Sequence, residues 1–289
     1  MKIVVCIKQV IDVTFPFALD QDKIEPLEAD LFYKANPADL CALEAALRLR
    51  DAHGGEVIVI GCGPARVEKA LKACLAMGAD QAMRIDAAHL ELNSQAKALL
   101  LAKAVARWSP DLILCGSRSL DEGTGETPVA VAEHLGLPQV TCVMALELSK
   151  DGGRVIVEKK LERGRRETIE CPLPALLSLE AGVLQPRYAL LTGMLAAHAA
   201  RIECLDANGL EIDSAQKMSF DALRRQIRQT LPRPRPKKSF TLETGMTAEQ
   251  RMEMMMSGGM KKSTGDLLEG SPGDLGKKLG SILQEKAFT

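Results

Sequence analysis

Short apolar runs alternate with longer amphipathic segments along the first half of the chain. The apolar runs, typical of buried strands, cover residues 2–7, 57–61, 81–86 and 111–115, and helical spacing is present at about 37–50, 64–77, 93–108 and 128–135. Asn36 can cap the first of these helices and Pro37 suits its first turn, while Gly78 follows the end of the second. The alternation predicts an α/β fold with a doubly wound, mostly parallel sheet.

The pattern changes after residue 140. Residues 142–148, 154–161, 167–171 and 175–179 are rich in β-formers and are separated by glycine-containing turns, which predicts a β-meander added to the parallel sheet. Residues 188–195 then form an apolar patch that suits either the core or a docking surface. The PRPRP run at 232–236 predicts an extended linker.

The last part of the chain, residues 241–289, is rich in methionine and has too little apolar content for a core of its own. Two interpretations remain open for this C-terminal extension arm: it is disordered, or it lies along another subunit.

Composition limits the function classes. The net charge of −1 and the 3% of aromatic residues argue against nucleic-acid binding, and no apolar run approaches the length of a bilayer. The eight cysteines show no metal-ligand spacing, so we expect no metal and no disulfide. Without a signal peptide before the first strand, a cytoplasmic protein with no direct membrane span is expected. Nucleophile-elbow and P-loop motifs are also missing, so no catalytic residue is nominated and binding is favoured over turnover.

A candidate anion site lies in residues 110–140, PDLILCGSRSLDEGTGETPVAVAEHLGLPQV. A buried strand leads into a loop of small residues at 116–127, and a helix follows; this arrangement presents backbone N–H groups to a phosphate. An ordinary connection is the simpler alternative, but the loop is longer than such connections usually are. Because the connections at 6–9, 36–39 and 62–64 reach the same carboxyl edge of the sheet, we expect a mononucleotide there.

Several stretches together resemble the β subunit of electron-transfer flavoproteins, including the FixA-type relatives. The matching stretches are VVCIKQVID (4–12), NPADLCALEAALRLRD (36–51), CGPARVEKALKACLAMGAD (62–80), PDLILCGSRSLDEGTGET (110–127), AEHLGLPQVT (132–141) and QPRYALLTGM (185–194). The resemblance implies a heterodimer with an α subunit that carries FAD, and electron transfer between a flavin dehydrogenase, such as an acyl-CoA dehydrogenase, and a downstream acceptor. It also implies AMP in this chain, or a second FAD that takes hydride from NADH if the protein is electron-bifurcating.

The resemblance assigns two sets of residues. For the nucleotide it implies Cys6, Asn36, Pro37, Ala38, Asp39, Cys62, Arg118, Ser119, Leu120, Asp121, Glu122, Gly123, Thr124, Gly125, Glu126, Thr127, Pro128 and Val129. For docking of the redox partner it implies Arg187, Tyr188, Leu190, Leu191 and Met194, with Leu191 as the anchor. The expected domains are a nucleotide-binding α/β domain at 1–200 with the docking loop at 185–195, a connecting segment with the linker at 201–240, and the arm at 241–289.

Some positions depart from the family pattern. Glu126 stands where Gln is usual and Pro128 where Gly is usual; a carboxylate near a pyrophosphate costs energy unless it points away or pairs with Arg118, and proline removes an N–H donor. Lys160 replaces a carboxylate, and residues 196–200 replace lysines, which predicts an altered redox partner. A stand-alone ATP-binding regulator on the same kind of sheet is the remote alternative.

Overall fold

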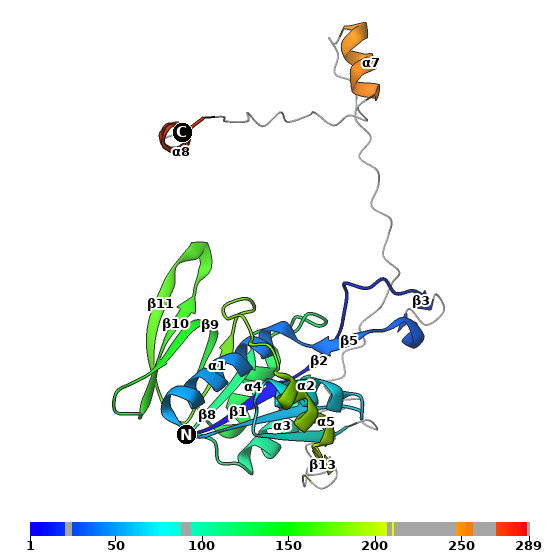
Figure 1. Ribbon diagram of the computed structural model, residues 1–289, viewed down its shortest axis with the longest axis vertical. Helices are drawn as coiled ribbons and strands as arrows, with labels where there is room; N and C mark the ends of the chain where they lie inside the picture. Colours follow the sequence, from blue (N-terminus) through cyan, green and yellow to red (C-terminus); the bar gives the residue numbers. More distant parts are fainter. Residues whose placement is uncertain (21–24, 88–93, 207–209, 211–246, 257–269, 288–289) are drawn as a thin grey trace. The chain divides into compact units, whose positions relative to one another are not determined.

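The computed structural model describes residues 1–20, 25–87, 94–206, 210, 247–256 and 270–287 (Figure 1). The chain forms two compact units, Met1–Leu231 and Pro232–Thr289. The described residues of the second unit form two helices, α7 (Ala248–Met256) and α8 (Pro272–Ala287). The linker predicted at 232–236 lies outside the described residues.

One large sheet organises the first unit. Its strands, in spatial order, are β11 (Arg166–Pro172), β10 (Arg154–Lys160), β9 (Gln139–Leu148), β12 (Ala175–Leu179), β8 (Leu112–Gly116), β1 (Lys2–Ile7), β6 (Glu56–Cys62), β7 (Gln81–Asp86) and β13 (Glu203–Asp206). Every pairing from β9 through β12 to β13 is parallel, while β10 is antiparallel to both β9 and β11. The predicted α/β class with a mostly parallel sheet is therefore confirmed.

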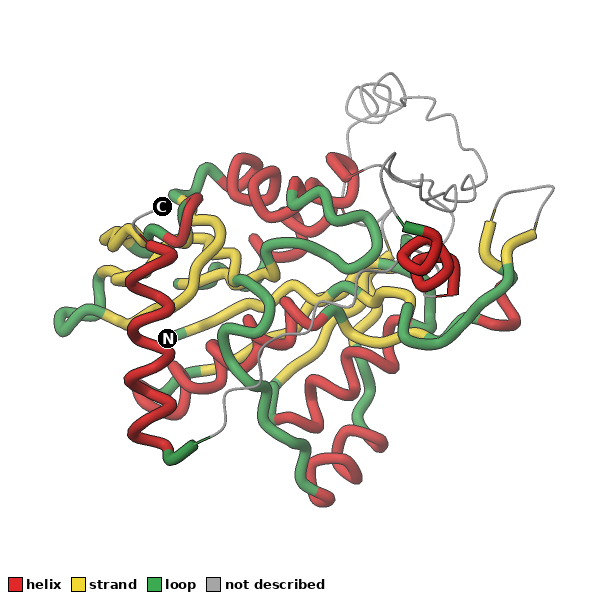
Figure 2. Tube along the Cα trace, turned by 90° about the horizontal axis from the view of Figure 1, so that it is seen from above, coloured by secondary structure: helices red, strands yellow, loops and turns green. Residues whose placement is uncertain are grey.

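Helices cover both faces of this sheet (Figure 2). Helices α1 (Pro37–His53) and α2 (Val67–Met77) pack on the face that receives Ile3, Val5 and Ile7 of β1. Helices α3 (Ser94–Ala106) and α4 (Glu126–Leu135) pack on the other face, against Val4 and Cys6. Successive side chains of a strand point to opposite faces, so the continuous apolar run of β1 supplies both core layers.

The meander prediction is correct for three of its strands and wrong for the fourth. Strands β9, β10 and β11, with a short 3₁₀ turn at Glu162–Gly164, form the antiparallel extension. Strand β12 instead lies between β9 and β8, parallel to both, and all its residues are buried. A strand of the parallel core is covered on both faces, which explains why four of the five residues in ALLSL are apolar.

The structure adds short strands that the sequence pattern does not reveal. Residues 9–35 contain β2 (Gln9–Ile11) paired with β5 (Tyr33–Ala35) and β3 (Leu19–Asp20) paired with β4 (Glu25–Pro26). A 3₁₀ turn, Glu28–Asp30, follows β4. At the far edge of the large sheet, β13 pairs with β7.

Helix α5 (Leu191–Ala199) packs on α2 and begins within the segment predicted to dock a partner, residues 185–195. Within the described residues, no helix has both the length and the apolar character needed to cross a membrane.

Candidate functional site

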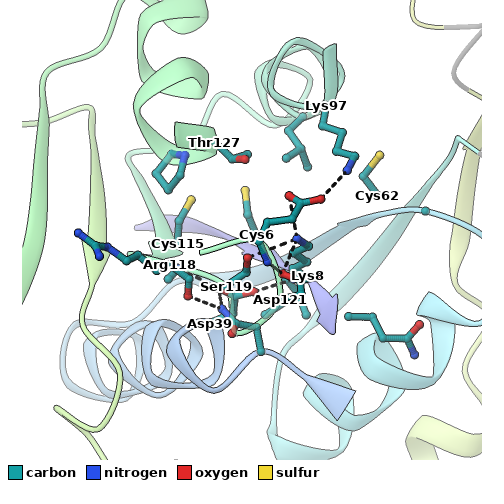
Figure 3. A pocket seen from close by; sticks show the side chains of 18 of the residues that line it. Cys6, Lys8, Asp39, Cys62, Lys97, Cys115, Arg118, Ser119, Asp121 and Thr127 are labelled. Atoms are coloured by element: carbon teal, nitrogen blue, oxygen red, sulfur yellow. Dashed lines mark hydrogen bonds and ion pairs between the residues drawn. The ribbon is translucent and has the colours of Figure 1, made fainter. Parts of the chain in front are cut away.

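A cavity of about 530 Å³ opens at the carboxyl edge of the parallel strands. Its walls come from the ends of β1, β6 and β8, the starts of α1 and α2, the loop after β8, and the inner sides of α3 and α4 (Figure 3). This is the place where ligands bind in open parallel sheets, because the connections diverge there and leave space.

Asp39 holds the cavity floor together. Its Oδ2 accepts a hydrogen bond from the backbone N–H of Lys8 at 2.7 Å, and its Oδ1 accepts one from the N–H of Gly116 at 3.0 Å. One carboxylate on α1 thus fixes the ends of two neighbouring strands, β1 and β8. Burial raises the pKa of Asp39 to about 6, while these hydrogen bonds and that from Asn36 act in the opposite direction.

Gly116 is needed for this arrangement because the helix comes so close. A Cβ at this position would lie only 2.7 Å from the Cβ of Ala38 and 2.8 Å from the backbone N of Asp39. Only glycine allows α1 to begin directly against the end of β8.

Asn36 has a different role from the expected one. It occupies the N-cap position of α1, but its side chain makes no capping hydrogen bond. Its Nδ2 instead donates to the carbonyl of Arg118 and to Asp39 Oδ1, both at 3.0 Å, and its Oδ1 accepts from the N–H of Leu120 at 3.2 Å. The side chain therefore fixes the start of the loop after β8.

That loop ends in three backbone N–H groups without a hydrogen-bond partner among the described residues, and two of them belong to residues that line the cavity. Gly123 and Gly125 adopt left-handed conformations with φ of 64° and 69°, which turn the chain into α4. No described residue accepts a hydrogen bond from the N–H groups of Gly125, Glu126 or Thr127. These groups lie at the positive end of the helix dipole, so an anion fits there. Pro128 is the third residue of α4, where an N–H has no partner within the helix, and its missing donor costs little.

Charged side chains line the cavity on the side away from the strands. Lys8 Nζ lies 2.8 Å from Asp121 Oδ1 and 3.2 Å from Glu122 Oε2. Lys97 Nζ of α3 lies 3.5 Å from Glu122 Oε1. Burial tends to raise the pKa of Asp121, but hydrogen bonds from Lys8 and Ser119 prevail and lower it.

Three thiols from adjacent strands form an unreactive part of the wall. Burial raises the pKa of Cys62 to about 11, and a hydrogen bond from the Cys115 thiol to Cys6 together with burial raises the pKa of Cys115. The thiols of Cys62 and Cys115 therefore stay protonated at neutral pH and behave as small apolar surfaces, not as nucleophiles or metal ligands. Among the described residues, no group of three or more His, Cys, Asp or Glu side chains is arranged to hold a metal ion.

The structure brings most of the predicted nucleotide residues to this one cavity. Those that line it are Cys6, Asn36, Asp39, Cys62, Arg118, Ser119, Asp121, Glu122, Thr124, Gly125, Thr127 and Pro128. Those that do not line it are Pro37, Ala38, Leu120, Gly123, Glu126 and Val129. Glu126 is exposed and lies outside the lining, so its carboxylate does not occupy the anion position that its sequence neighbours form.

The cavity also includes residues that the sequence did not single out by name. Lys8 and Gln9 continue the β1 connection, which was expected to reach this edge, whereas Arg66 and Lys97 were not expected at all. Gln9 Nε2 donates to the Arg66 carbonyl at 2.9 Å, and Gln9 Oε1 is buried without a hydrogen-bond partner among the described residues. The Arg66 guanidinium stacks 4.4 Å above the ring centre of Tyr33.

The predicted docking residues are mostly exposed. Tyr188 is 88% exposed, Leu190 74% and Leu191 71%, and Met194 is exposed on the first turns of α5. Arg187 differs from these. Its Nε donates to the buried carboxylate of Glu44 at 2.9 Å and its Nη1 to Asp51 at 2.9 Å. Arg187 therefore fastens the segment to α1.

Comparisons with known proteins agree on one family. Residues 27–210 match the family model described as electron transfer flavoprotein domain. The electron transfer flavoprotein subunit beta of Thermoanaerobacterium thermosaccharolyticum is 37% identical over 220 residues, which cover 74% of this chain and 81% of the relative. The protein of the same name from Bos taurus is 30% identical over 223 residues (76% and 86%), and that from Methylophilus methylotrophus is 28% identical over 258 residues (88% and 97%).

The fold and the cavity define a mostly parallel α/β protein with an open cavity at the carboxyl edge of its sheet. The chain belongs to the electron transfer flavoprotein family, and within it to the β subunits.

Proposed function

We propose that this chain is the β subunit of a heterodimeric electron-transfer flavoprotein and binds an adenine nucleotide, AMP or FAD, in the cavity beside α4. The α subunit carries the FAD that transfers electrons between a flavin dehydrogenase and a downstream acceptor. The chain's own residues hold the nucleotide, support the α subunit and dock the dehydrogenase. They act in the cytoplasm.

The observation that carries the proposal is the cavity with unpaired N–H groups at one end. A nucleotide phosphate at the start of α4 would accept hydrogen bonds from Gly125, Glu126 and Thr127, where the helix dipole also favours negative charge. The lining continues to the thiols of Cys6 and Cys62, which suit the apolar faces of a base. The donor set therefore fits a phosphorylated nucleotide.

The exposed side chains around Leu191 suit the docking role. Apolar residues that stay exposed side by side on a monomer mark interaction surfaces, and this patch also includes Leu195, which is 65% exposed. Lys160 lies at the end of β10 and pairs with Glu180 at 3.5 Å. A positive group at that place favours a contact surface on the partner proteins that is more acidic than the family pattern implies.

The test is a nucleotide analysis of the heterodimer purified after coexpression with its α subunit. One flavin and one AMP per heterodimer are expected for the ordinary form. Two flavins and no AMP, together with NADH oxidation, would identify the electron-bifurcating form. A heterodimer with no nucleotide beyond the flavin of α would overturn the proposed site.

A sedimentation experiment addresses the stand-alone alternative. We expect the purified chain to form a 1:1 complex with α. A monomer that binds ATP and ignores α would contradict the assignment as a subunit.

A further inference from the structure

Two ammonium groups from different elements meet on one carboxylate at the cavity. Lys8 follows β1 and lies 3.2 Å from Glu122 Oε2, whereas Lys97 lies on α3 and is 3.5 Å from Glu122 Oε1 (Figure 3). Both lysines and Glu122 line the cavity. The Glu122 carboxylate thus binds both cations, and Lys8 pairs with Asp121 as well, at 2.8 Å.

The loop that carries Glu122 also leads into the free donors of α4. Asp121 and Glu122 lie between Ser119, which accepts a hydrogen bond from the N–H of Gly123, and the helix start at Glu126. The cavity therefore contains N–H donors without an acceptor and, in its wall, two cations neutralised by loop carboxylates. These are the two kinds of group with which proteins bind phosphate.

We propose that Lys8 and Lys97 bind the phosphate in the nucleotide site. Without a nucleotide, the Glu122 carboxylate pairs with both lysines in place of the phosphate, and the entering nucleotide displaces it. This inference rests on the proposed function and adds a set of residues to it. Lys97 is the residue that tests this inference best, because it lies on α3, outside the strand ends and the loop from which the expected site residues come.

The geometry favours displacement over permanent pairing. The side chains of Lys8, Lys97 and Glu122 are 34%, 37% and 51% exposed, and ion pairs that water reaches this easily are weak. A nucleotide phosphate carries up to two charges and can also bind the N–H groups at the start of α4, which Glu122 does not reach in the structure. Its entry also removes an unfavourable contact, since a carboxylate left beside a phosphate would repel it.

The exchange makes the site selective for phosphorylated ligands. Adenosine offers no charge to Lys97 and leaves the pairs with Glu122 intact, whereas AMP competes for both lysines. Removal of the Lys97 charge should therefore weaken the binding of AMP and leave the binding of adenosine almost unchanged. Removal of the Glu122 charge should strengthen the binding of AMP, because Glu122 then neither competes with the phosphate for the lysines nor repels it.

The test is calorimetric titration of AMP and of adenosine into the heterodimer after its nucleotide has been removed. For Lys97→Gln we expect the Kd of AMP to rise about tenfold, and for Glu122→Gln to fall about fivefold, with the Kd of adenosine within about twofold of wild type in both. Lys150→Gln, on an exposed turn after β9, is the matched control and should change neither ligand. The salt dependence of AMP binding should also decrease in Lys97→Gln.

The outcomes separate this inference from the proposed function. If the wild-type heterodimer binds neither AMP nor a second FAD, the proposed site is wrong. If wild type binds AMP and Lys97→Gln binds it equally well, only the inference is overturned. The inference would also be overturned if Lys97→Gln lost equal affinity for AMP and adenosine, or if Glu122→Gln bound AMP more weakly than wild type.

Discussion

Asp39 shows at the scale of one residue how this fold builds its site. The residue belongs to the first turn of α1, yet its carboxylate is bound by backbone groups that follow β1 and end β8, and by Asn36. All three groups are donors, so the position requires two acceptor oxygens. A buried polar group is stabilising when each of its hydrogen bonds is made. The same position is destabilising when a donor replaces an acceptor and faces another donor.

The first prediction concerns Asp39→Asn. The amide would direct an NH₂ group at donors that now bind an oxygen, and we expect the free energy of unfolding at pH 7 to fall by about 2 kcal/mol. Urea denaturation followed by circular dichroism measures the change. Glu167→Gln, on exposed strand β11, removes a carboxylate without such partners and should change stability by less than about 0.5 kcal/mol. Similar effects of the two substitutions would show that Asp39 does not fasten the strands.

The second prediction concerns pH. Burial raises the pKa of Asp39 in the folded protein to about 6, above the ordinary aspartate value of 3.8. The folded state therefore binds more protons than the unfolded state between these values, so the contribution of Asp39 is most favourable below pH 3.8 and declines as pH rises towards 6. The stability difference between wild type and Asp39→Asn should narrow by about 1 kcal/mol from pH 5 to pH 7. A difference that widens over this interval would contradict the raised pKa.

Individual site residues were predictable where they follow strand ends and not elsewhere. Cys6, Cys62 and the loop after β8 could be placed because parallel strands bring their carboxyl ends to one edge. Lys97 could not, because its contact with Glu122 depends on how α3 lies against the sheet, which the sequence pattern does not specify. Arg187 was assigned to docking, but its partner Glu44 lies far away in the sequence, and no local signal connects the two.

At the scale of elements, hydrogen bonds hold the segment proposed to dock a partner, and the residues beside it, to two helices of the fold. Glu44 and Asp51 of α1 bind Arg187, and the Cys41 thiol donates to the carbonyl of Leu184 at 3.2 Å. On the other side, Lys72 of α2 donates to the carbonyl of His198 at 3.0 Å. A preorganised surface loses less conformational entropy on binding, which favours fast exchange between partners without a loss of affinity.

The third prediction tests this segment with Leu191→Ala. Because Leu191 is 71% exposed, stability should change by less than about 0.5 kcal/mol. If it is the anchor, the KM of the heterodimer for its dehydrogenase should rise about tenfold. Steady-state electron transfer at varied heterodimer concentration measures this.

Gly193→Ala provides the complementary variant. The added Cβ would lie 2.5 Å from the carbonyl oxygen of Ala76, so α5 must move away from α2. We expect both the melting temperature and the dehydrogenase affinity to fall, although no exposed side chain is removed. Unchanged transfer rates in both variants would show that the dehydrogenase binds elsewhere.

The success of the element predictions depended on burial. Strands β1, β6 and β8 and helices α1 to α4 were predicted because each buries a long, regular apolar pattern. Strand β12 was misplaced because a run of five mostly apolar residues fits a meander and a buried parallel strand equally well. Strand β13, with the sequence ECLD, has no apolar run, and only its pairing with β7 makes it a strand.

At the scale of the whole molecule, the described part of the second unit comprises two helices with several exposed apolar side chains. Met252 is 65% exposed and Met256 86% in α7, while Leu279 is 52% exposed in α8. Both helices nevertheless begin with well-formed caps: Thr247 exchanges hydrogen bonds with Gln250, and Ser271 does so with Asp274. Helices of 9 and 16 residues are marginal in water, so caps combined with exposed apolar faces indicate elements that become stable on a partner.

The last prediction is that α8 binds the α subunit through its apolar face. Leu279→Asp places a charge on that face, and we expect the Kd of the heterodimer to rise at least about tenfold. Ser281→Asp adds the same charge to the same helix, about 200° around its axis, and should leave the Kd within about twofold of wild type. Because neither residue belongs to the sheet unit, the cavity and its nucleotide content should stay the same in both variants. Equal Kd values for the two variants would show that the face of α8 is not what α binds, and a loss of nucleotide from Leu279→Asp alone would show that the arm contributes to the site itself.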